Sequence, residues 1–155
     1  MASKLQVAFV DLDTQIEHLA SKSIAAIFTD EGERSFRLIE ARVLKSLSLS
    51  GPTILATGGG VILAAENRKK LQALGKVIWL QANPKELVRR LAGSDERPAL
   101  TPLSPLDEAR LLAEKRHKLY EETAELKVDT NDKSEEVVCN ELEQLWNTVQ
   151  SDNLR

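Results

Sequence analysis

Short, continuous apolar runs separated by long helical stretches constrain this 155-residue chain more than any other feature of its sequence. Three such runs cover residues 7–10, 53–56 and 76–80, and a weaker fourth run covers 126–128. Strands of this kind are typical of parallel sheets that helices cover on both faces. Because strands and helices alternate along the chain, the pattern predicts an α/β fold with a doubly wound parallel sheet and right-handed crossovers.

Capping patterns indicate where the helices begin. Asn83-Pro84 and Ser104-Pro105 each place a capping side chain before a proline at the first helical position. Two or three helices are expected between residues 14 and 47, and a last helix with one apolar face over 134–149. The lid-like segment at about 93–106 contains three prolines and is longer than a simple connection needs.

The overall composition argues against several functional classes. The net charge is −3 and aromatic residues make up 4% of the chain, so nothing favours binding to nucleic acid or to an anionic membrane. A single cysteine is typical of a reducing compartment, and the sequence shows neither a membrane-spanning apolar run nor a signal peptide. No Cys/His cluster has zinc-site spacing. We therefore expect one cytoplasmic domain over residues 1–155, with no nucleic-acid or membrane partner.

Two carboxylates follow the first predicted strand. Asp11 and Asp13 are alternate residues of an extended segment, so their side chains share one face at the end of the sheet where ligands of such folds bind. Such a pair can hold Mg²⁺ through water, accept hydrogen bonds from hydroxyls, or take a proton. The alternative is a structural role, in which Asp13 caps a helix that begins near Thr14.

A glycine-rich turn, Thr57-Gly58-Gly59-Gly60, follows the second predicted strand. Glycine permits positive φ and lets bare backbone N–H groups approach a ligand. The alternative is a flexible connection from strand to helix. Three consecutive glycines exceed what a turn requires, which favours a ligand-binding role for the turn, and the ligand predicted there is a small anion.

Several arginines are candidates for contacting such an anion. Arg37 and Glu40 are three residues apart on one helix face, either as a surface ion pair or as an arrangement in which Glu40 orients Arg37 toward a carboxylate. Arg97 lies in the proline-rich loop, where a mobile cation could close over phosphates. Arg90 and Arg116 lie on flanking helices, and each taken alone is more typical of a solvated charge.

Taken together, these segments resemble the shikimate kinase family along nearly the whole chain. The resemblance begins with Phe9-Val10-Asp11-Leu12-Asp13 and continues through Phe36-Arg37, Ile39-Glu40 and the glycine turn. It ends with Arg97-Pro98, Arg116 followed by Leu119-Tyr120, and Val128-Asp129-Thr130. The glycine triplet alone is a weak signal, whereas the ordered set at these spacings is specific.

The resemblance implies a P-loop kinase fold and transfer of the ATP γ-phosphoryl group to the 3-hydroxyl of shikimate, a step of chorismate and aromatic amino-acid biosynthesis. It also implies Mg²⁺ and a monomeric enzyme. Asp13 and Arg97 would be catalytic. The shikimate-binding residues would be Asp13, Arg37, Gly59, Gly60 and Arg116. The residues on the nucleotide side would be Arg90 against adenine, Arg97 at the phosphates and Asp11 at Mg²⁺.

One element of the family pattern does not occur in these 155 residues. No segment reads G-x-x-x-x-G-K-[ST], the loop whose amides, lysine and hydroxyl hold phosphates and magnesium. In the family's strand order, 2-3-1-4-5, the strand that leads into this loop is the central one. We therefore expect the strands at 53–56 and 76–80 to lack their shared neighbour, and the chain to be marginally stable alone and a poor ATPase or kinase.

Three interpretations of the missing loop follow from the sequence. In the first, the sequence is a fragment of a longer kinase. In the second, the chain is a natural non-kinase that keeps the shikimate half-site as a binding module. In the third, it is a related kinase for another small hydroxylated acid such as gluconate. The pair of Arg37 and Arg116 argues for a carboxylate but does not select the acid.

Overall fold

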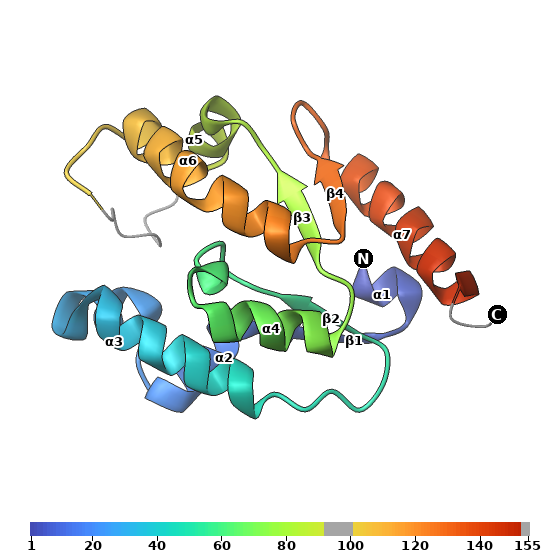
Figure 1. Cartoon of the computed structure of the whole chain (residues 1–155), viewed down its shortest axis with the longest axis horizontal. Coiled ribbons are helices and arrows are strands. Elements are labelled where there is room, and N and C mark those ends of the chain that lie inside the picture. Colours follow the sequence, from blue (N-terminus) through green and yellow to red (C-terminus); the bar gives the residue numbers. More distant parts are fainter. Residues whose placement is uncertain (92–100, 153–155) are drawn as a thin grey trace.

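A computed structural model describes residues 1–91 and 101–152 of the chain (Figure 1). Helices and strands alternate along most of these residues, as the apolar runs predict. The elements are α1 (Ala2–Leu5), β1 (Ala8–Asp11), α2 (Leu12–Ala20), α3 (Ile24–Ser46), β2 (Thr53–Ala56), the 3₁₀ helix η1 (Val61–Leu63), α4 (Ala65–Leu74), β3 (Ile78–Gln81), α5 (Pro84–Leu91), α6 (Pro105–Thr123), β4 (Leu126–Asp129) and α7 (Glu135–Asp152).

The four strands form two separate parallel pairs. β1 pairs with β2, with Ala8 opposite Thr53, and β3 pairs with β4, with Ile78 opposite Leu126. Among the described residues no strand lies between β2 and β3, so each keeps one edge outside a ladder. The predicted strands and their parallel direction are confirmed, and so is the expectation that β2 and β3 lack a shared neighbour.

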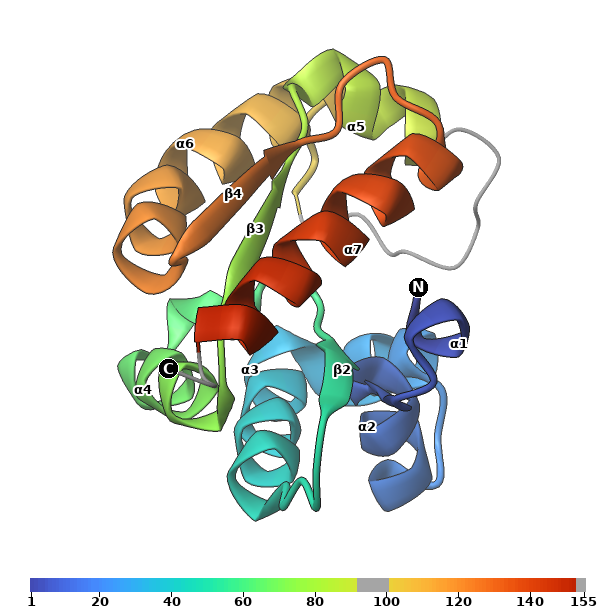
Figure 2. The ribbon, with the colours of Figure 1, turned by 90° about the vertical axis from the view of Figure 1, so that its right-hand side faces the viewer.

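The two strand pairs define two halves of the molecule. The β1–β2 half contains α2, α3, η1 and α4, and the β3–β4 half contains α5, α6 and α7 (Figure 1). Figure 2 shows α6 and α7 on opposite faces of the β3–β4 pair. The halves are tied together where the Gln72 amide of α4 donates hydrogen bonds to the carbonyls of Glu122 and Thr123, near the end of α6.

The apolar core of the described residues lies in the β1–β2 half. Its buried side chains come from α2, α3, η1 and α4, because the apolar positions of these helices recur at spacings that place them on one face. α6 reaches this core from the other half through Leu119 and Tyr120. The buried members are Leu12, Ile16, Ile27, Phe36, Val43, Leu44, Val61, Ile62 and Leu71.

The helix starts predicted from capping residues are confirmed at two positions and corrected at a third. The side chains of Asn83 and Ser104 accept the amide hydrogens of Glu86 and Asp107, at 2.9 and 3.2 Å. At the end of β1, however, Asp11 rather than Asp13 is the N-cap. The helix begins two residues earlier than expected, because the Asp11 carboxylate accepts the amide hydrogens of both Asp13 and Thr14.

Helix α3 consists of two helical stretches joined at Gly32, which has φ 81° and ψ 172°. A residue with a side chain adopts this conformation only with strain, so glycine explains why the chain turns here and resumes a helix at Glu33. With α2, the region between residues 14 and 47 therefore holds the two or three helices that the sequence predicts. No helix within residues 1–91 and 101–152 has the length and apolarity needed to cross a membrane.

Candidate active site

The glycine turn after β2 is a surface against which polar side chains from three helices pack. A methyl group at Gly58 would lie 3.4 Å from Oδ1 of Asp13, and one at Gly60 would overlap the guanidinium of Arg37. A methyl group at Gly59 would lie 2.8 Å from the Tyr120 hydroxyl and 3.7 Å from Nη1 of Arg116. The three glycines have no left-handed φ, so the turn needs glycine for close approach and not for positive φ.

These packing contacts bring together five of the predicted site residues. Asp13 comes from α2, Arg37 from α3 and Arg116 from α6, and all three meet at the turn that contains Gly59 and Gly60. The structure thus places one carboxylate and two guanidinium groups around the same short stretch of backbone. Their roles toward a ligand remain predictions.

Arg37 is fixed mainly by its pairing with Glu40. Nη1 of Arg37 donates to both carboxylate oxygens of Glu40, at 2.9 and 3.0 Å. The Glu40 side chain is only 2% exposed, so this is a buried ion pair rather than the surface pair that sequence spacing also allowed. The Phe36 ring lies 4.9 Å from the guanidinium carbon and supports its face.

Burial raises the pKa of the Glu40 carboxyl above its usual range, although the Arg37 charge opposes this shift. The neighbouring Asp13 carboxylate raises the pKa further, and Arg116 lowers it. Glu40 therefore lies within the electrostatic reach of both Asp13 and Arg116. Among the described residues, the only hydrogen bonds that fix its position are the pair from Arg37.

Tyr120 belongs to the site although sequence reasoning assigned it no role. Its hydroxyl donates to the carbonyl of Gly59 at 2.6 Å, and its ring stacks on Trp79 with centroids 5.0 Å apart. The signal that could have found it is its position on α6, four residues after Arg116 and hence on the same helix face. The hydrogen bond anchors the carbonyl side of the turn.

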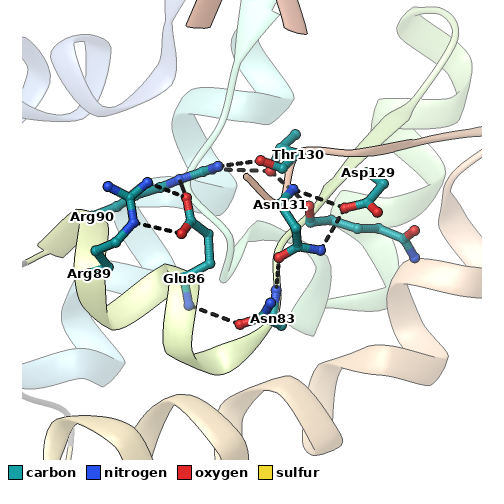
Figure 3. A network of polar contacts seen from close by, with 8 residues as sticks. Asn83, Glu86, Arg89, Arg90, Asp129, Thr130 and Asn131 are labelled. Atoms are coloured by element: carbon teal, nitrogen blue, oxygen red, sulfur yellow. Dashed lines mark hydrogen bonds and ion pairs between the residues drawn. The ribbon is translucent and has the colours of Figure 1, made fainter. Parts of the chain in front are cut away.

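A second polar cluster lies at the C-terminal ends of β3 and β4 (Figure 3). The buried Glu86 carboxylate of α5 accepts hydrogen bonds from Arg89 and Arg90 at 2.6 to 2.7 Å. Arg89 and, less strongly, Arg90 lower the pKa of Glu86 to about 2, although desolvation opposes this shift. Arg90 also donates to the hydroxyl and carbonyl of Thr130, at 3.1 and 2.5 Å. These contacts tie α5 to the end of β4.

The same cluster orders the turn after β4. The Asp129 carboxylate accepts both the backbone and the side-chain N–H of Asn131, whose own amide oxygen accepts the backbone N–H of Asn83 at 2.8 Å. The backbone N–H of Asn131 is the main cause that holds the pKa of Asp129 below its usual range. Arg90 thus has hydrogen-bond partners on α5 and after β4, although its side chain is 39% exposed.

Asp11 has a structural function that limits its use as a metal ligand. Its Oδ1 atom caps α2 by accepting from Asp13 and Thr14, at 2.9 and 3.2 Å. No group of three or more His, Cys, Asp or Glu side chains that could hold a metal ion occurs in the described part of the chain. Any Mg²⁺ at Asp11 would therefore take most of its ligands from water and from a bound phosphate group. Arg97 lies outside the described residues.

The parallel strands and the charged cluster on the glycine turn define an α/β protein with a candidate site for a small anion. A sequence model of one family, described as shikimate kinase, matches residues 1–146. The shikimate kinase of Vibrio parahaemolyticus is 39% identical over 142 residues, which cover 92% of this chain and 83% of that protein. The shikimate kinase of Nitrosococcus oceani is 40% identical over 134 residues, or 86% and 70% of the two chains.

Solved structures agree with the sequence relatives. A shikimate kinase from Acinetobacter baumannii in complex with shikimate has a TM-score of 0.88 and 33% identity, over 99% of this chain and 84% of that one. The shikimate kinase of Aquifex aeolicus has a TM-score of 0.74 and 32% identity, over 96% and 86% of the two chains. The chain belongs to the shikimate kinase family, which consists of ATP-dependent kinases with the P-loop kinase fold.

Proposed function

We propose that the glycine turn and the side chains around it bind shikimate for phosphorylation by ATP at its 3-hydroxyl. The observation that carries the proposal is the packing of Asp13, Arg116 and Arg37 against three consecutive glycines. A small hydroxylated acid needs cations for its carboxylate and a carboxylate for its hydroxyls, and this turn has both within one short span. Family membership supports shikimate as that acid.

In this proposal the two guanidinium groups bind the substrate carboxylate. Arg37 is held by the buried Glu40, and Arg116 is itself buried, so neither has to be ordered when the ligand arrives. Backbone N–H groups of Gly59 and Gly60 add donors at the floor of the site. A carboxylate that is recognised by preformed donors binds in one orientation, which sets where the hydroxyls lie.

Asp13 is the proposed hydroxyl-binding and catalytic residue. It packs over Gly58 in the first turn of α2, so its carboxylate can accept a hydrogen bond from a substrate hydroxyl. It can then take the hydroxyl proton as that oxygen bonds to the γ-phosphorus of ATP and the bond from this phosphorus to the leaving oxygen of ADP breaks. The second proposed catalytic residue, Arg97, would stabilise negative charge on the transferred phosphoryl group. This assignment rests on the family pattern alone.

The nucleotide side is proposed to include Arg90, Asp11 and Mg²⁺. The hydrogen-bonding edge of Arg90 is engaged by Glu86 and Thr130, so we assign its contact with adenine to the flat face of the guanidinium. Mg²⁺ would neutralise phosphate charge, with Asp11 holding it through water. Because no G-x-x-x-x-G-K-[ST] segment occurs in these 155 residues, we expect shikimate binding to survive in this chain better than ATP turnover.

Calorimetry with shikimate and ATP separately, combined with an assay of ATP-dependent shikimate phosphorylation, tests the proposal. The 155-residue chain is compared with a version that carries a strand and phosphate-binding loop before Met1. We expect both to bind shikimate and the extended version to be much the faster kinase. Shikimate binding without turnover by either would favour a binding module, and absence of shikimate binding by both would refute the proposed site.

We also propose that the protein acts as a monomer in the cytoplasm, without nucleic acid. The net charge of −3 disfavours polyanionic partners such as nucleic acid. Light scattering coupled to size-exclusion chromatography should give the mass of one chain.

A substrate panel that includes gluconate would test the choice of acid.

A further inference from the structure

Two glutamates share the Arg37 guanidinium, and they differ sharply in environment. Glu40 is 2% exposed and uses both carboxylate oxygens, at 2.9 and 3.0 Å from Nη1. Glu33 is 47% exposed and uses one oxygen, Oε1, which accepts from Nε and from Nη2 at 3.2 Å each. The first pair is buried and close, whereas the second is open to solvent and long.

The edge of Arg37 that Glu33 covers has the donor geometry that suits a carboxylate, and its Nη2 atom is the Arg37 atom nearest Gly60. Arginine binds a free carboxylate most strongly through two parallel N–H donors, each directed at a different carboxylate oxygen. Because Glu40 occupies Nη1, the donor pair of Nε and Nη2 is the remaining edge of this kind, and Glu33 lies across it. Glu33 satisfies that edge with a single oxygen, which is weaker geometry than an incoming carboxylate could achieve.

The position of Glu33 follows from the break in α3. Gly32 interrupts the helix with φ 81°, so Glu33 is the first residue of the second helical stretch and lies one turn before Arg37. A carboxylate is favourable at the start of a helix and at the i,i+4 spacing from an arginine. The fold thus places the Glu33 carboxylate beside Arg37 and leaves Glu33 exposed to solvent.

We propose that the Glu33 carboxylate competes with the substrate carboxylate for Arg37. Glu33 occupies the Nε and Nη2 edge of Arg37 in the empty site, and shikimate displaces it. This inference rests on the proposed function, because it takes Arg37 as the carboxylate-binding residue. An exposed ion pair is weak and is easily exchanged for a better-aligned one. Glu33 therefore tunes affinity for the carboxylate, while Glu40 keeps the guanidinium in place throughout.

The test is the shikimate Kd of the 155-residue chain, measured by calorimetry for the unsubstituted protein, E33Q and E31Q. Glu31 is the matched control because it lies on the same helix, loses the same charge, and pairs with Lys22 and Ser35 rather than with Arg37. We expect E33Q to lower the Kd for shikimate about two- to fivefold relative to E31Q, the range expected for removing one exposed ion pair.

A neutral probe separates carboxylate competition from a general effect of charge. The methyl ester of shikimate has no carboxylate to exchange with Glu33, so E33Q, E31Q and the unsubstituted chain should bind it equally. Equal tightening of acid and ester in E33Q would overturn the inference. Weaker shikimate binding by E33Q than by E31Q would also overturn it, because Glu33 would then support the site and not compete for it.

A fourth variant, R37Q, distinguishes failure of this inference from failure of the proposed function. If R37Q weakens shikimate binding at least tenfold while E33Q and E31Q bind alike, Glu33 is no competitor and the carboxylate site stands. If R37Q binds as well as the unsubstituted chain, or if that chain does not bind shikimate, both the carboxylate site and the role of Glu33 are refuted. Circular dichroism of each variant checks that the helices are intact.

Discussion

The two halves of the molecule are held together by different kinds of interaction. The nine buried side chains of the main core come from α2, α3, η1 and α4 in the β1–β2 half. Among the described residues of the β3–β4 half, the buried side chains are mostly polar or charged, namely Glu86, Arg116, Thr123 and Thr130, with Val128. One half is therefore stabilised by apolar burial, and the other relies more on hydrogen bonds and ion pairs.

This difference bears on the two sides of the proposed reaction, although Arg116 brings α6 of the β3–β4 half into the proposed carboxylate site. The carboxylate site is attached to the apolar half through Arg37 and Glu40 on α3, whereas Arg90 is held by the polar network of the other half (Figure 3). Since β2 and β3 are not paired, little backbone hydrogen bonding connects the halves. The apolar half should therefore be less sensitive to salt than the half that relies on ion pairs.

The largest expected effect is a loss of stability when a core side chain of the apolar half is shortened. Leu44 is fully buried, and L44A should lower the free energy of unfolding by about 2–5 kcal/mol through lost burial and a residual cavity. The comparison variant L80A removes a β3 side chain that is 51% exposed and should cost less than about 1 kcal/mol. Urea denaturation followed by circular dichroism measures both. Equal costs would show that the core is not confined to the β1–β2 half.

The second expected effect is on the glycine turn. A methyl group at Gly60 would overlap the Arg37 guanidinium, so G60A must displace that side chain and should weaken shikimate binding at least tenfold. G58A is the matched variant, because its methyl group would make an ordinary contact 3.4 Å from Asp13 and should cost much less. Calorimetric titration of both variants decides whether close approach, rather than backbone flexibility, is the reason for glycine.

The third expected effect is a pH dependence of the stability that the Glu86 ion pairs contribute in the polar half. The pKa of Glu86 is lowered from 4.5 to about 2 by Arg89 and Arg90, so the ionised form stabilises the fold above pH 4.5. That stabilisation is lost as the pH falls from about 4.5 to about 2. E86Q should melt below the unsubstituted chain at pH 6, and the gap should close on acidification.

Thermal melts of E86Q between pH 6 and pH 2 test this dependence. Glu66 offers the control, since its side chain is 83% exposed and pairs only with Lys69 among the ion pairs of the described residues. E66Q should follow the unsubstituted chain over the whole range. A constant gap between E86Q and the unsubstituted chain at every pH would show that packing, and not charge, explains the effect.

The smallest expected effect concerns the contact between the halves. Y120F removes the hydroxyl that donates to Gly59 but keeps the ring that stacks on Trp79. We expect a loss of about 0.5–1.5 kcal/mol in the free energy of unfolding, the usual net contribution of one hydrogen bond. A modest loss of shikimate affinity should accompany it, because the turn would be less firmly held. Denaturation and calorimetry on the same preparation measure both quantities.

Sequence patterns predicted the elements of this fold better than their boundaries. Apolar runs located all four strands, and capping residues located the starts of α5 and α6. The predicted start of α2 was wrong because either Asp11 or Asp13 could act as a cap, and only the backbone path decides which one does. Residue patterns made Asp13, Arg37 and the glycines candidates, whereas Arg116 and the proposed roles came from the family resemblance, since a single arginine carries no local signal of what it contacts.

By itself, the sequence determined that the chain alternates parallel strands with helices, and that a glycine turn and a set of arginines follow those strands. These are properties of local periodicity and residue type. Only the tertiary structure decided that Glu40 is buried and Glu33 exposed, and that Tyr120 anchors Gly59. The physical reason is that burial and pairing depend on which distant segments meet, and residue spacing along one helix cannot specify that.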